Sequence, residues 1–297
     1  MQRYFYDHGL PFSTKVAENI DSLILRIKKK KASMVVIDGG VGEGKTTFGV
    51  HIADYVQGKY IRQAKKELGW TNTQNDINFK NQYAIGGDQF QEKLQISYEL
   101  KLAVAIYDEA GDFSTRGALT AFNKRLNRIF QTYRAFKILV IIILPNFNVL
   151  ENNLFDLKIP RLLFNCHNRD DYQGNFRAYS LYRMHYLKDK MRKLVIKEFA
   201  YTQVTPNFRG HYLDLEPNRS KELDEISTKG KLEIVSENVL ESKGLISKKT
   251  IASKLCRTER WVTAKLNKLK IKSQMTHKKR NYYDASALEF LRNELAS

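Results

Sequence analysis

Hydrophobic residues recur along the first half of the chain in two alternating patterns, one helical and one extended. Residues 13–30 place apolar side chains three and four positions apart, which predicts an amphipathic helix with Ser13 as its N-cap. Further helical patterns run from Lys45 to Val56, after Gly87 and over 118–136. Between the helical patterns lie short runs that are apolar on both faces, at 34–37, 82–85, 102–109 and 137–146. Such runs are typical of a parallel sheet covered by helices on both sides, so we expect an α/β fold.

The pattern changes in the second half of the chain. Residues 161–200 contain the strand-like runs LLFNCH, FRAYSLYRMHYL and KLVIKEF, which predict an edge strand or a hairpin. Pro206, Pro217 and mixed charges predict a connector with one helix over 205–238, and 239–297 form a small, basic, mainly helical unit. We therefore expect a core over 1–204, a connector over 205–238 and a separate domain over 239–297.

A glycine-rich segment follows the first predicted strand and carries the clearest chemistry. It fits G-x-x-x-x-G-K-[ST] without a gap and reads Gly39, Gly40, Val41, Gly42, Glu43, Gly44, Lys45, Thr46 and Thr47. Backbone N–H groups lined by glycine can wrap a triphosphate closely, and the start of a helix favours an anion. We expect these residues to bind ATP, with Lys45 at the β- and γ-phosphates and Thr46 as a Mg²⁺ ligand. The alternative is a glycine-rich turn that binds nothing, which the flanking strand and helix disfavour.

Two adjacent carboxylates, Asp108 and Glu109, end the third apolar run about sixty residues after the loop. Asp108 is expected to hold Mg²⁺ through water, and Glu109 to polarise the water that attacks the γ-phosphate. Alone, an Asp-Glu pair at a strand end favours a solvated turn, but the upstream loop favours the catalytic interpretation.

This combination resembles the additional-strand, catalytic-glutamate division of P-loop ATPases. The resemblance implies that one strand lies between the loop and the Asp-Glu pair, for which 82–85 is the candidate. It also implies that Asn146, at the end of KILVIIILPN, senses the γ-phosphate; the alternative is an Asn that closes a turn after Pro145.

Within that division, residues 34–170 resemble HerA/FtsK-type and zonular-occludens-toxin-like motors through DEAGDFSTRG and RLNRIFQTYRAFKILVIIILPN. The resemblance implies a homo-oligomeric ring, a hexamer for example, in which an arginine of one subunit completes the site of its neighbour. We expect this arginine to be Arg128 or Arg134. Arg116, Arg125 and Arg161 are further candidates, and each of the five is otherwise a surface arginine.

The C-terminal stretch SKKTIASKLCRTERWVTAKLNKLKI predicts a helix, a short turn and a second helix with Thr258 as its N-cap. A basic wing and a closing helix are expected after it, a layout similar to winged helix-turn-helix domains. The residues expected to contact DNA are Lys248, Lys249, Arg257, Thr258, Arg260, Thr263, Lys265, Lys268, Lys278, Lys279 and Arg280. The alternative is a solvated helical hairpin used for assembly.

Charge supports a polyanionic partner. The formal net charge is +18, and residues 239–297 hold 14 basic and 5 acidic residues, a net charge of +9 on a fifth of the chain. Such density suits neutralisation of DNA phosphates. Two isolated cysteines, Cys166 and Cys256, form no disulfide framework, and the longest apolar run, 138–144, is too short to span a bilayer. A cytoplasmic protein without stable membrane insertion is expected.

Taken together, these features predict an ATP-hydrolysing DNA motor that packages, translocates or transfers viral, plasmid or mobile-element DNA. One alternative is an ATP-dependent replication or transposition initiator or loader that acts as a DNA-bound switch. Two further alternatives are a regulator that binds ATP without hydrolysing it and a membrane-associated assembly ATPase. The presence of Glu109 argues against the non-hydrolysing regulator.

Overall fold

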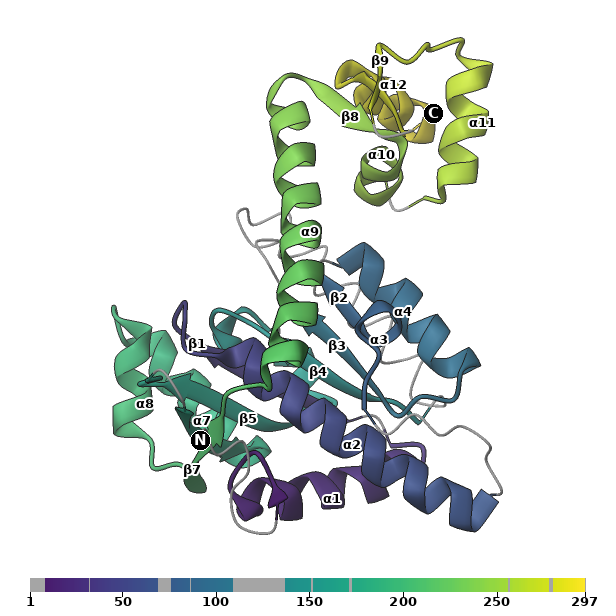
Figure 1. The fold of residues 1–297 in the computed structure, drawn as a ribbon. Helices are drawn as coiled ribbons and strands as arrows, with labels where there is room; N and C mark the ends of the chain where they lie inside the picture. The colour runs from purple at the N-terminus through teal and green to yellow at the C-terminus, as the bar shows by residue number, and fades with distance from the viewer. Residues whose placement is uncertain are drawn as a thin grey trace. The chain divides into compact units, whose positions relative to one another are not determined.

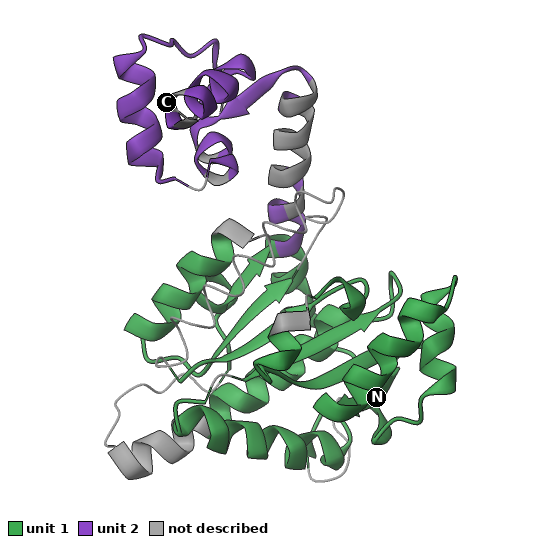
Figure 2. Cartoon of the chain, turned by 180° about the vertical axis from the view of Figure 1, so that it is seen from behind, with its two compact units in different colours: residues 1–226 green, residues 227–297 purple. Residues whose placement is uncertain are grey.

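The chain divides into two compact units, Met1–Ile226 and Ser227–Ser297 (Figure 2). The computed structural model describes residues 9–31, 33–68, 76–85, 87–108, 137–150, 152–170, 173–255, 257–277 and 280–296. Within these residues, no helix is both long and apolar enough to cross a membrane.

A seven-stranded sheet organises the first unit (Figure 1). Its strands are β1 (Met34–Gly39), β2 (Tyr83–Ile85), β3 (Val104–Asp108), β4 (Leu139–Ile143), β5 (Pro160–His167), β6 (Gln173–Ser180) and β7 (Phe208–Leu213). Their order is β2-β3-β4-β1-β5-β6-β7. The first five strands of this order are parallel, β6 is antiparallel to β5, and β7 is antiparallel to β6. This mostly parallel sheet flanked by helices is a P-loop NTPase-like fold.

Helices cover both faces of the sheet (Figure 1). One face packs against α2 (Lys45–Leu68), with α1 (Thr14–Lys28) beside it. On the other face, α4 (Gly87–Glu99) covers β2 and β3, and α7 (Leu181–Lys193) covers β5 and β6. Shorter helical segments complete the unit: α3 (Phe79–Gln82), η3 (Phe147–Val149), α6 (Asn152–Asp156), η4 (Lys197–Phe199) and α8 (Ala200–Gln203).

Phe48, in the first turn of α2, fixes that helix on the sheet. Its fully buried ring stacks on Phe176 of β6 and Tyr212 of β7, with centroids 4.9 and 4.5 Å apart, and meets Phe164 of β5 edge-on. A Cβ on the next residue, Gly49, would lie 2.9 Å from Cδ1 of Ile143. A glycine therefore lets the start of α2 approach the sheet closely, which places Lys45 and Thr46 near the strand ends.

The strand candidate at 82–85 forms β2, which lies between the loop and Asp108 along the chain as expected, and it is the outermost strand of the sheet. Two other expectations from the sequence need correction. The run KLVIKEF is not a strand: it spans the end of α7 and η4, with Val195 and Ile196 exposed. Residues 208–213 fall within the expected connector, yet they form β7, because alternate side chains such as Tyr212 pack against Phe48.

Helix α9 (Pro217–Ser242) begins in the first unit and continues into the second, and it is the one helix expected in the connector. The second unit contains β8 (Leu245–Ser247), α10 (Lys248–Lys254), α11 (Glu259–Lys268), β9 (Met275–His277), β10 (Arg280–Asp284) and α12 (Ser286–Ala296). The strands form an antiparallel sheet in the order β8-β10-β9. A small core that includes Ile251, Val262, Leu266 and Leu291 holds these elements together.

Candidate active site

The glycine-rich loop connects the carboxyl end of β1 to the first turn of α2. Gly39 has φ +143°, and a Cβ there would lie 2.3 Å from the carbonyl oxygen of Cys166 on the neighbouring strand β5. Gly44 has φ +69°, and a Cβ there would lie 2.8 Å from Oη of Tyr212. Both positions disfavour residues other than glycine, because the backbone has a positive φ and a Cβ would lie too close to neighbouring atoms. The loop is therefore a tight backbone cradle at the edge of the sheet.

Lys45 turns back over this cradle. Its Nζ donates hydrogen bonds to the carbonyl oxygens of Gly39, at 2.9 Å, and Gly40, at 2.6 Å. Partial burial lowers the pKa of Lys45, and the nearby carboxylates of Asp108 and Asp38 act in the opposite direction. The ammonium group is thus held at the loop, where it can meet an anionic ligand.

Thr46 and Asp108 meet across the sheet edge. The hydroxyl of Thr46 donates to Oδ2 of Asp108 at 2.7 Å, although 62 positions separate the two residues. Tyr83 of β2 donates to the same carboxylate oxygen at 2.6 Å. A hydroxyl and a carboxylate are oxygen ligands of the kind that Mg²⁺ prefers, so this pair fits a magnesium site.

Residues of the antiparallel part of the sheet hold the outer side of the loop. The Tyr212 hydroxyl donates a hydrogen bond to the carbonyl oxygen of Glu43, and the Glu43 side chain accepts one from the backbone N–H of Arg169 at 3.0 Å. The guanidinium of Arg169 pairs with Asp214 at 2.5 Å, and its side chain packs against Gly44. Strand β7 and the turn after β5 therefore fix the conformation of the loop.

Asp38 is a fully buried carboxyl one residue before the end of β1. Oδ2 accepts hydrogen bonds from the backbone N–H of Phe147, at 2.9 Å, and from the Tyr201 hydroxyl, and Oδ1 accepts one from Asn165 at 3.0 Å. Burial raises the pKa of Asp38 to about 6, although these donors act against the rise. Asp38 thus connects the base of the loop to β5, to α8 and to the turn after β4.

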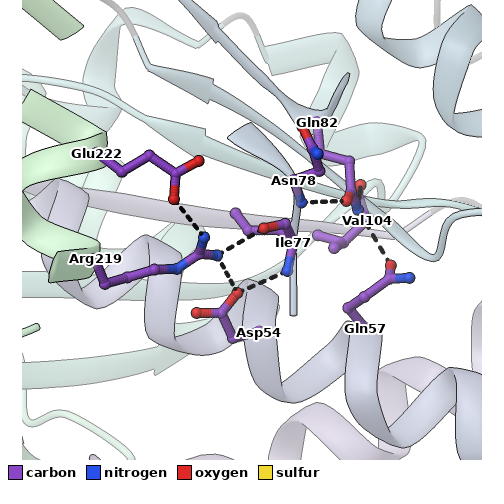
Figure 3. Close-up of polar contacts among 8 residues, drawn as sticks. All are labelled: Asp54, Gln57, Ile77, Asn78, Gln82, Val104, Arg219 and Glu222. Carbon is purple, nitrogen blue, oxygen red and sulfur yellow. Dashed lines mark hydrogen bonds and ion pairs between the residues drawn. The ribbon is translucent and has the colours of Figure 1, made fainter. Parts of the chain in front are cut away.

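The polar contacts in Figure 3 position the segment that leads into β2, the strand that carries Tyr83. Gln82 donates to the carbonyl oxygen of Val104 on β3, at 2.9 Å, and to Gln57 of α2, at 3.1 Å. Nearby, Arg219 of α9 donates to Asp54 of α2, at 2.8 Å, and to the carbonyl oxygen of Ile77, at 2.7 Å. Burial raises the pKa of Asp54 to about 6, with Arg219 acting in the opposite direction. These contacts fix the segment before β2 against the helix that carries Lys45 and Thr46.

The structure places some of the other expected site residues and leaves others outside its described part. Asn146 caps η3 by accepting a hydrogen bond from the N–H of Asn148 at 2.9 Å, as expected of an Asn that closes a turn. Arg161 lies at the amino end of β5, beside the start of β1, whereas the glycine-rich loop of the same chain follows the carboxyl end of β1. Glu109, Arg116, Arg125, Arg128 and Arg134 lie outside the described residues.

The second unit displays several of the residues expected to contact DNA. Thr258 is the N-cap of α11 and accepts a hydrogen bond from the N–H of Trp261 at 3.2 Å. The exposed members of the set are Lys268, Arg257, Thr258 and Arg260, whereas Lys248, Thr263 and Lys265 are half-buried. Lys278 and Lys279 lie outside the described residues, as do the side chains of Lys249 and Arg280.

Sequence reasoning missed four residues around the loop: Asp38, Tyr83, Arg169 and Tyr212. None belongs to a motif, and Tyr212 falls in the segment that was expected to be a connector. Asp38 carried one signal, a carboxyl directly after the apolar run 34–37. The others become recognisable only when the sheet brings their strands together.

Comparisons with known proteins leave the family open. No family model matches the chain, and no curated protein matches it significantly. Among solved structures, the chain is similar to the crystal structure of flagellar accessory protein FlaH from Methanocaldococcus jannaschii. The identity is 15%, the TM-score is 0.26, and the match covers 54% of this chain and 84% of that chain. The fold assignment accordingly rests on the order and direction of the strands and on the loop between β1 and α2.

Proposed function

We propose that the chain is an ATP-hydrolysing enzyme that acts on DNA. One observation carries the proposal of ATP hydrolysis. The Thr46 hydroxyl lies 2.7 Å from the Asp108 carboxylate, directly beside the loop over which the Lys45 side chain folds back. Residues far apart in the sequence thus meet where a nucleotide phosphate and its cation would bind. A glycine-rich turn without a ligand would not require this convergence.

The residues present fit a magnesium nucleotide. Thr46 and Asp108 would hold the cation, which when bound neutralises phosphate charge and orients the phosphates. Lys45 would exchange the Gly39 and Gly40 carbonyl oxygens for the β- and γ-phosphates, and Tyr83 keeps Asp108 facing the loop.

Turnover requires a base next to the γ-phosphate, and Glu109 directly follows Asp108 at the end of β3. We assign that role to Glu109. Asn146 would sense the γ-phosphate from the turn after β4, and an arginine of a neighbouring subunit, Arg128 or Arg134, would stabilise the transition state.

DNA is the partner that the charge of the second unit favours. Arg260 and Lys268 of α11 are exposed, as is Arg257 just before the helix, and a β-hairpin follows α11. A helix-turn-helix with a following wing is suited to the major groove and the adjacent phosphates. We therefore propose a winged helix-turn-helix function for residues 239–297 and a DNA motor, assembled as a ring, for the whole chain.

Nucleotide chemistry is tested by the variant Lys45→Ala, with Lys80→Ala as a control for removal of an exposed lysine. Lys45→Ala should abolish ATP binding measured by calorimetry with magnesium present, and also turnover, whereas the control should retain both. Glu109→Gln should bind ATP but hydrolyse it at least about 100-fold more slowly. Unchanged turnover in Lys45→Ala would refute the proposed ATP site.

The action on DNA is tested by the rate of hydrolysis with and without DNA. A motor should be stimulated by DNA of any sequence. A sharp sequence-specific footprint with slow turnover would instead favour the initiator or loader. Particle mass measured with ATP tests the ring, since a monomer under turnover conditions would contradict it.

A further inference from the structure

Two arginines lie directly opposite each other in the antiparallel part of the sheet. Arg177 of β6 pairs in register with Arg209 of β7, and Asn165 of β5 is the next partner in the same row. Residues paired in register share a face of the sheet, and Asn165 is paired in turn with Asp38. The two arginines therefore lie on the face that carries Asp38, opposite to the face covered by α2.

This arrangement is unfavourable without a ligand. Like charges directly opposite in an antiparallel pair repel each other. Within the described residues, neither arginine forms an ion pair, and Arg209 is exposed while Arg177 is half-buried. The nearby acids already serve other donors, since Asp38 accepts three hydrogen bonds and Glu43 accepts one from the N–H of Arg169.

A histidine in the next row adds an unsatisfied polar atom. His167 ends β5, and its Nδ1 is buried without a hydrogen-bond partner among the described residues. His167 pairs in register with Asn175, two residues before Arg177 on β6, so His167 and the two arginines lie on the same face in adjacent rows and form one cluster. Burial lowers the pKa of His167, with the charges of Arg177 and Arg209 acting in the same direction and its own backbone and Glu43 acting against them.

We propose that Arg177, Arg209 and His167 form a phosphate-binding patch for a nucleic-acid backbone on the first unit. Guanidinium groups match phosphate geometry with paired hydrogen bonds, and two of them side by side suit a chain of phosphates. Arg209 lies on the face of the sheet opposite to α2, whereas the glycine loop leads into the first turn of α2. We therefore assign a phosphate on Arg209 to a nucleic acid rather than to the nucleotide in the loop.

The patch goes beyond the proposed function because it gives the ATPase unit its own contact with the DNA. It rests on that function only in assuming that DNA is a partner. A contact beside the nucleotide loop would let hydrolysis act on the DNA without relying on the second unit alone.

The test is the full chain with Arg177→Gln and Arg209→Gln, compared with the unaltered chain and a matched control. The control, Arg192→Gln with Lys193→Gln, removes the same charge from two exposed residues at the end of α7. Fluorescence anisotropy with labelled single- and double-stranded oligonucleotides at several salt concentrations gives affinity and its salt dependence. For duplex DNA, loss of two phosphate contacts should lower the slope of log affinity against log salt by about 1 to 2. At low salt the affinity should fall about tenfold or more, and the control should stay within about twofold.

Two further measurements separate the possible outcomes. The double variant should unfold at the same temperature as the unaltered chain or higher, because a repulsion is removed; a lower unfolding temperature would contradict the inferred repulsion. Calorimetry should give unchanged ATP affinity, and a loss of ATP binding without a loss of DNA binding would assign the patch to the nucleotide and overturn the proposal. Unchanged DNA binding in the double variant refutes the patch alone, whereas no DNA binding by the unaltered chain refutes the patch and the DNA partner together.

Discussion

Asp38→Asn tests the energetics of the loop base most directly. The carboxyl is fully buried, and its pKa rises from 3.8 to about 6 on folding. The folded state therefore holds its proton more tightly than the unfolded chain does. A shift of about two units corresponds to roughly 3 kcal/mol of differential free energy.

The sign and the pH window follow from the raised pKa. Below pH 3.8 the carboxyl is protonated in both states and contributes no pH dependence. Between pH 3.8 and about 6 the unfolded chain ionises first, so the free energy of unfolding falls as the pH rises. Above about pH 6 the loss is complete, and the ionised group costs about 3 kcal/mol relative to its protonated form.

Asparagine cannot ionise, so Asp38→Asn lacks this titration. Urea unfolding of both proteins from pH 3.5 to 7.5 gives the free energy of unfolding at each pH. The difference, variant minus unaltered chain, should rise by about 3 kcal/mol across the window, because contributions from other groups cancel. Turnover should fall, since an amide cannot accept from Phe147, Asn165 and Tyr201 in the same way. A difference that stays constant with pH would refute the reasoning.

Three further predictions follow from the described contacts. Tyr83→Phe removes a hydrogen bond to the Asp108 carboxylate, worth about 1.5–3 kcal/mol, and should raise the Mg²⁺ concentration for half-maximal turnover about tenfold; an unchanged Mg²⁺ titration would contradict this role. Phe48→Ala should lower the free energy of unfolding by about 3–5 kcal/mol in urea titrations, and a loss below about 1 kcal/mol would show that the aromatic cluster can collapse around the gap. Deleting 239–297 should lower DNA affinity and its salt dependence while basal hydrolysis persists, so an unaltered salt slope would place the binding in the first unit.

The sequence by itself determined the elements that depend on local pattern. Runs that are apolar on both faces identified β1, β3 and β4, and helical spacing identified α1 and α4, because burial on two faces or on one stripe leaves a direct mark on composition. The glycine loop was readable for a similar reason. Positive φ and close backbone contact at Gly39 and Gly44 are tolerated by few residues other than glycine.

Only the tertiary structure decided which residues meet at the loop. The meeting of Thr46, Tyr83 and Asp108 depends on strand order, in which β4 lies between β1 and β3 and β2 is outermost, because strand pairing is a long-range choice. Tyr212 reaches Glu43 from a segment whose proline and charge content predicted a connector. The opposition of Arg177 and Arg209 likewise depends on the register between two antiparallel strands, which no local pattern of the sequence specifies.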